Sequence, residues 1–121
     1  MAPARFSEAE IARRLPVWCA MACLFLDTEP TDGDYRAAAA AIGEAGFGAQ
    51  EAQAIFLEEV APAFAPNLLA IAGEWAGWSD DLVRERVLAT CGSRFARAAA
   101  WMLGRDYLAA QWAHIAECLE S

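Results

Sequence analysis

Apolar residues recur every three or four positions along most of the chain, the spacing that places them on one face of an α-helix. The first such series consists of Ile11, Leu15, Trp18, Cys19, Ala22, Phe25 and Leu26. Just before it, Ser7 followed by Glu10 has the spacing of a capping box, which predicts that a helix begins here. Pro16 lies inside the series, so the helix either kinks there or restarts with Pro16 in its first turn.

The same spacing predicts further helices over residues 35–45, 49–61, 67–75, 80–90 and 94–119. Thr31 or Asp32 is expected to cap the first of these, and Gly46 to end it. Pro62 and Pro66 should end one helix and let another begin, because proline cannot donate a backbone hydrogen bond.

Two further observations, one on Gly104 and one on strand patterns, complete the expected fold. Gly104 is expected to form a bend or joint in the last helix. No segment shows a sustained alternation of apolar and polar residues bounded by hairpin turns. We therefore expect an all-α protein, a compact single-domain bundle of five to seven helices over residues 1–121.

Residues 58–78 are the stretch around which we expect the bundle to form. Two prolines are followed by a short apolar run and then by Glu74, Trp75 and Trp78. We expect Glu74 to be pressed between the two indoles, and Trp75 and Trp78 fit either a contact surface or the core. The other three tryptophans lie on apolar helix faces and are expected in the core: Trp18, Trp101 and Trp112.

Charge is distributed unevenly. The 121 residues carry a net charge of −8, and residues 27–81 hold eleven acids against Arg36 alone, a local charge of −10. Phosphate backbones would repel such a chain, which argues against nucleic-acid binding and favours a basic protein partner. The alternative is an acidic face that serves solubility.

Several function classes find no support in the residues. No apolar run reaches the roughly 18 residues of a membrane span, and the N-terminus lacks a signal-peptide layout, so we expect a cytoplasmic protein without a membrane partner. The chain has one histidine and no glycine-rich phosphate loop followed by Lys-Ser or Lys-Thr. We therefore expect no enzyme and no cofactor.

A metal site is the alternative suggested by the cysteines. Cys19 and Cys23 are four residues apart, as are His114 and Cys118. Two such pairs on packed helices could supply the ligands of a tetrahedral zinc site. Cysteine is also among the most buried residue types, so core packing explains the same positions.

Four short stretches carry a resemblance to a known family. They are FLDTE at residues 25–29, EVAP at 59–62, NLL at 67–69 and AGEWAGW at 72–78. Over about residues 15–90 the chain resembles a family of small acidic bacterial proteins of unknown function. The resemblance implies that Asp27, Glu29 and Glu74 belong to one constellation, either a structural network or an interface.

The leading hypothesis is an acidic helical interaction protein, an immunity- or antitoxin-type inhibitor that neutralises a basic bacterial toxin or effector. Acidic patches steer association with such partners. The expected partner-binding residues are Asp27, Glu29, Asp32, Asp34, Glu51, Glu58, Glu59, Glu74, Trp75 and Trp78. Two alternatives stay open: a zinc-binding helical domain, and a homo-oligomeric structural protein such as a homodimer that packs its tryptophan-rich helices.

Overall fold

The computed structural model of the chain describes residues 6–26, 29–66 and 78–120, apart from the side chain of Leu103. All regular secondary structure in these residues is helical, which confirms the all-α prediction. The elements are α1 (Glu8–Ala22), the 3₁₀ turn η1 (Cys23–Phe25), α2 (Asp32–Ala45), α3 (Ala49–Ala54), the π-helical segment η2 (Ile55–Val60), α4 (Ala61–Phe64), α5 (Asp80–Thr90) and α6 (Arg94–Glu120).

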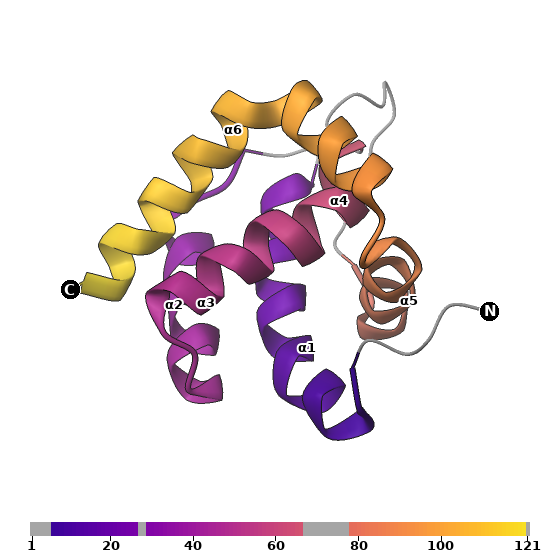
Figure 1. The fold of residues 1–121 in the computed structure, drawn as a ribbon. Coiled ribbons are helices and arrows are strands. Elements are labelled where there is room, and N and C mark those ends of the chain that lie inside the picture. The colour runs from indigo at the N-terminus through magenta and orange to yellow at the C-terminus, as the bar shows by residue number, and fades with distance from the viewer. Residues whose placement is uncertain (1–5, 27–28, 67–77, 121) are drawn as a thin grey trace.

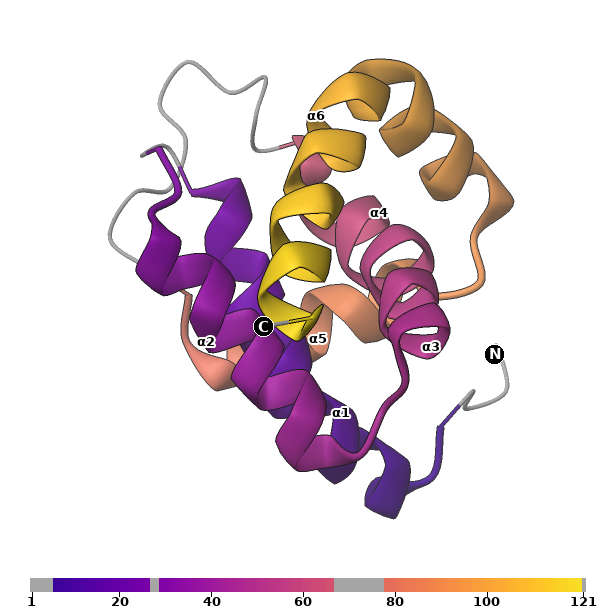
Figure 2. The same cartoon turned by 90° about the vertical axis from the view of Figure 1, so that its left-hand side faces the viewer.

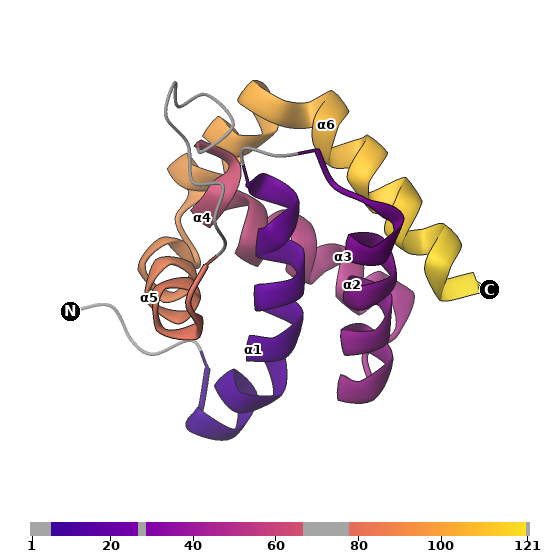
Figure 3. The same cartoon turned by 180° about the vertical axis from the view of Figure 1, so that it is seen from behind.

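Helix α1 lies in the middle of the bundle, with α2 on one side and α5 on the other (Figure 3). The run α3–η2–α4 forms one nearly continuous helix that crosses α1 (Figure 1). Helix α6 passes over this run: its first half lies beside α4 and its second half lies over α2 (Figures 1 and 2). Helix α1 and the segment η2 therefore lie at the centre of the molecule, with α2, α5 and α6 packed around them.

The predicted helix starts are confirmed by their caps. The hydroxyl of Ser7 accepts the N–H of Glu10 at 3.1 Å. Thr31 and Asp34 form a reciprocal capping box at the start of α2, and Gly46 ends α2 in the left-handed conformation with φ 80°. A residue without a β-carbon adopts that conformation at little cost, which is why the helix ends there.

Two prolines lie inside helical backbone. Helix α1 continues through Pro16. The expected break before Pro62 does not occur as a turn, because the backbone stays helical from α3 to Phe64. The segment η2 widens instead, and the N–H of Ala61 donates to the carbonyl of Phe56, five residues back. Pro62 then falls in the first turn of α4, where a missing N–H is tolerated.

The core takes side chains from all of these helical elements, with the largest ones on α1, η1, η2 and α4. Its largest fully buried side chains are Trp18, Phe25, Phe56, Phe64, Met21 and Leu24. Trp18 is buried as predicted and Trp112 is half-buried against Phe56, but Trp101 is 49% exposed, so its expected core position is wrong. Gly104 interrupts α6 with non-helical angles (φ −141°, ψ 24°), at the position where the sequence predicts a bend or joint.

The predicted helix over 67–75 lies outside the described residues, as does the expected position of Glu74 between Trp75 and Trp78. None of the helices in the described ranges combines the length and the apolar character that a membrane crossing requires.

Candidate interaction surfaces

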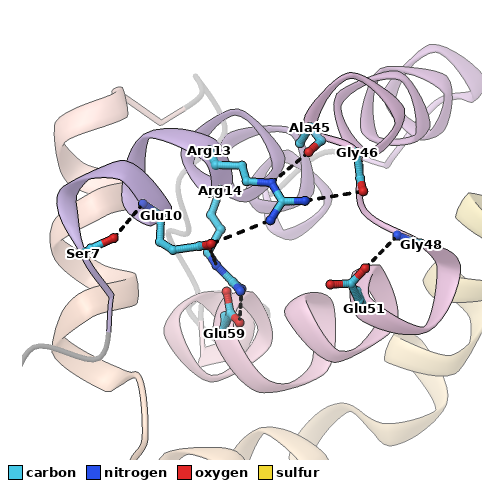
Figure 4. A network of polar contacts seen from close by, with 9 residues as sticks. All are labelled: Ser7, Glu10, Arg13, Arg14, Ala45, Gly46, Gly48, Glu51 and Glu59. Atoms are coloured by element: carbon cyan, nitrogen blue, oxygen red, sulfur yellow. Dashed lines mark hydrogen bonds and ion pairs between the residues drawn. The ribbon is translucent and has the colours of Figure 1, made fainter.

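Glu59, one of the expected partner-binding acids, points into the bundle (Figure 4). Its carboxylate accepts the indole N–H of Trp18 at 2.8 Å and pairs with Arg14 at 2.8 Å. The Glu59 and Arg14 side chains are only 13% and 19% exposed. Burial raises the pKa of Glu59, while the Trp18 N–H and the Arg14 charge act to lower it. Glu59 therefore fastens η2 to α1 and is not presented to a partner.

The neighbouring arginine, Arg13, ties α1 to the end of α2 (Figure 4). Its guanidinium donates to the carbonyl oxygens of Ala45 at 2.9 Å and Gly46 at 3.4 Å, where the helix leaves carbonyl groups without internal partners. The same group lies 4.0 Å from the centroid of the Phe47 ring. Arg13 thus holds α1 against the end of α2, while Arg14 holds it against η2.

Asp34 and Glu51 cap helices. The Asp34 carboxylate accepts the backbone N–H of Thr31 at 2.8 Å, and Glu51 accepts that of Gly48 at 3.1 Å. Each carboxylate sits in the first turn of its helix, where it also complements the helix dipole. Their sequence positions are explained by local structure, although both still contribute negative charge at the surface.

Trp78 is anchored inside the fold. Its indole N–H donates to the carbonyl of Ala22 at 2.8 Å, and its ring lies 5.0 Å from that of Phe64. The Arg86 guanidinium covers the ring at 5.3 Å. The polar edge of Trp78 is thus used internally, so a partner would meet only part of the ring. The other expected residues, Asp27, Glu74 and Trp75, lie outside the described residues.

A concentrated acidic surface remains at the start of α2. Glu29 and Asp32 are exposed, and with Asp34 they surround Tyr35. The pKa of the Tyr35 hydroxyl is raised first by burial and further by these three carboxylates, against the lowering effect of its bond to Gln111.

The last turns of α6 extend this surface. A shallow hollow of about 220 Å³ is lined by Asp32, Arg36, Glu117 and Cys118. We call Glu29, Asp32, Asp34 and Glu117 the α2 acidic surface. Arg36 is the basic residue that lines the hollow.

The expected acids that the structure describes do not form one patch. Glu51 lies beyond the far end of α2, a helix of 14 residues and therefore roughly 20 Å long. Glu58 faces α6 and lies 3.7 Å from Arg97, both side chains being half exposed. The described acids thus divide into an acidic surface at the start of α2, two helix-capping carboxylates, the buried Glu59, and Glu58, which pairs with Arg97.

The first half of α6 carries an apolar surface that was not predicted from the sequence. Phe95 is 85% exposed, Met102 83% and Trp101 49%. Beside it, a hollow of about 530 Å³ is lined by Leu57 and Glu58 from η2 and by Arg94, Arg97 and Trp101 from α6. The available signal was Gly104, because a break there means that the apolar positions on its two sides need not share one face.

The structure does not bring the four predicted metal ligands together. No three His, Cys, Asp or Glu side chains in the described ranges are placed to hold a metal ion. Helix α2 packs between α1, which carries Cys19 and is followed by Cys23, and the half of α6 that carries His114 and Cys118 (Figure 3). The Cys19 thiol instead donates to Asp80 at 3.4 Å, and burial raises the pKa of Cys19 to about 12.

Residues 12–118 match the family described as "Domain of unknown function (DUF7079)", and the chain belongs to that family. This confirms the expectation of a family of unknown function. No curated protein and no solved structure matches the chain.

Proposed function

We propose that this chain is an acidic helical interaction protein, an immunity- or antitoxin-type inhibitor that binds and neutralises a basic bacterial toxin or effector. A bacterial origin is part of the proposal. The observation that carries it is the α2 acidic surface, where carboxylates from two helices gather beside a hollow. The proposal assigns the chain no catalysis and no cofactor.

The contacts of the remaining acids narrow the partner-binding set. Glu59 is neutralised by Arg14, and Glu58 lies beside Arg97. Two acids of the α2 acidic surface, Asp32 and Glu117, line the hollow together with Arg36. A surface of this kind attracts a basic protein over a distance of about one Debye length, so salt should weaken the complex.

The proposal is tested by capture of a partner on the tagged full chain from a lysate of the source organism, washed at about 50 mM and about 500 mM NaCl. The proposal expects one basic protein that is lost at high salt and whose toxic activity the chain abolishes. A captured protein that is acidic, or whose activity the chain leaves unchanged, contradicts the inhibitor assignment.

Matched charge reversals locate the binding surface. The double variant Glu29→Lys with Glu117→Lys should weaken binding at least about tenfold, because it reverses two acids of the surface without removing a helix cap. The control is Glu44→Lys with Glu85→Lys, which makes the same change in net charge at two exposed acids elsewhere. Equal weakening by both variants would mean that net charge matters and that the α2 acidic surface does not.

A further inference from the structure

The exposed apolar residues of α6 form a stripe along one side of the helix. Phe95, Ala98, Ala99 and Met102 have the spacing i, i+3, i+4, i+7, which places them on one face. Phe95 and Met102 are 85% and 83% exposed, and Ala98 is exposed between them. A large side chain thus stands at each end of the stripe, and small ones lie in the middle.

We infer that this stripe binds the same stripe of a second copy of the chain, with the two α6 helices antiparallel about a two-fold axis between Ala98 and Ala99. In that arrangement Phe95 of each copy packs on Met102 of the other. The alanines at the crossing let the two backbones approach closely. An interface with a two-fold axis uses every contact twice, so a self-complementary stripe fits a second copy better than it fits an unrelated surface.

Charge at the ends of the stripe favours the antiparallel direction. Arg94 precedes Phe95, and the side chain of Asp106, four residues beyond Met102 and past the interruption at Gly104, is fully exposed at 3.9 Å from Arg105. In an antiparallel pair, Arg94 of one copy lies at the Met102 end of the other copy, where Asp106 follows beyond the interruption at Gly104. A parallel pair would instead place Arg94 against Arg94.

The size of the stripe indicates a weak dimer. A stable interface buries roughly 800 Å² on each partner. Phe and Trp bury about 150–250 Å² each, so Phe95, Met102 and the flanking Trp101 supply roughly half of that area. Because full-sized interfaces already extend down to micromolar affinity, we expect this smaller interface to bind no more tightly than the micromolar range.

Sedimentation equilibrium of the full chain, from about 1 to about 300 μM, tests the inference. The chain should pass from monomer to dimer over this range. Ala98→Glu places a charge at the crossing point, where it meets its own copy, and should weaken dimerisation at least about tenfold. Ala109→Glu is the matched control: Ala109 is also exposed on α6 and also follows an arginine by four residues. It should leave the dissociation constant within about twofold.

A charge exchange tests the direction of the pairing. Arg94→Asp and Asp106→Arg should each weaken the dimer, and the double variant should regain most of the lost affinity because the two ends are exchanged together. A double variant that is weaker than either single variant would overturn the antiparallel arrangement.

A photo-cross-linking residue identifies the occupant directly. With p-benzoylphenylalanine in place of Met102, the inference expects a covalent dimer cross-linked near Phe95. A cross-link within one chain, for example to residues 67–77, would overturn the inference by showing that the chain itself covers the stripe. A chain that stays monomeric at about 300 μM, or equal effects of Ala98→Glu and Ala109→Glu, would overturn it as well.

Discussion

The two halves of α6 differ in what they bury, although both are rich in apolar residues. After Gly104, the helix buries Leu108, Gln111 and Ile115. Before Gly104, Phe95 and Met102 are more than four-fifths exposed. The C-terminal half lies on α2 (Figure 2), whereas the outward face of the first half has no helix over it in the described part of the chain.

A polar residue is buried in one half of the helix while a phenylalanine is exposed in the other. Gln111 is 7% exposed and accepts a hydrogen bond from the hydroxyl of Tyr35 at 2.6 Å. Phe95 is 85% exposed. Burial on α6 thus follows the position of the neighbouring helices and the pairing of polar groups, not residue type alone. A partner that binds the first half would bury the most apolar area, because these apolar side chains are still exposed to water.

The largest difference in the free energy of unfolding should appear when a large apolar side chain is shortened to alanine in each half. Ile115→Ala creates a cavity at a fully buried site and should lower the free energy of unfolding by about 2–5 kcal/mol. Met102→Ala, on the exposed stripe, should change it by less than about 0.5 kcal/mol. Urea denaturation measures both changes in the free energy of unfolding, at a protein concentration low enough that the proposed dimer is dissociated. A similar loss in the two variants would mean that the first half is packed as tightly as the second.

A second pair of variants compares two adjacent glutamates of η2, one facing α1 and one facing the first half of α6. Glu59→Ala removes the acceptor of the buried Trp18 N–H and the partner of Arg14. It should cost about 1–3 kcal/mol, because donors that are left unsatisfied carry a desolvation penalty. Glu58→Ala breaks only the half-exposed pair with Arg97 and should cost less than about 0.5 kcal/mol. Chemical denaturation measures both losses of stability. A larger loss for Glu58→Ala would mean that Glu58, and not Glu59, is the carboxylate that stabilises the fold.

A smaller effect is expected from one hydroxyl in the second half of α6. The Tyr107 hydroxyl donates to the carbonyl of Leu24, and burial raises the pKa of Tyr107 to about 12. Tyr107→Phe keeps the ring and should cost about 0.5–1.5 kcal/mol, the net value of one hydrogen bond. Tyr35→Phe is the comparison, and it should cost more because it leaves the buried side chain of Gln111 without its partner. Thermal unfolding of the two variants checks the order.

The helices were predictable from sequence where a local signal marks their ends. Ser7, Thr31 and Gly46 each act within one turn, and the predicted caps are present. The continuation of helix through Pro62 was not predictable, because it depends on the widened backbone of η2.

The candidate sites were harder to predict because they depend on long-range contacts. Glu59 joins the core through Arg14 and Trp18, which are 45 and 41 residues away. In the sequence it is indistinguishable from Glu58. Trp101 likewise has helical spacing with the buried Leu108, yet it lies before the interruption at Gly104 and is 49% exposed.

The smallest effect that we predict is a change in pH dependence at the buried carboxylate. Burial raises the folded-state pKa of Glu59 above its ordinary value of 4.5, so the stability that it contributes is fully present below pH 4.5 and is lost as pH rises through the folded pKa. Gln at this position does not titrate. From about pH 4 to about pH 7, the free energy of unfolding of Glu59→Gln should therefore rise relative to that of the wild type. Glu58→Gln, which keeps the buried carboxyl, should follow the wild-type slope in the same urea titrations. A constant gap between wild type and Glu59→Gln over this range would mean that the Arg14 pair compensates fully for the burial of Glu59.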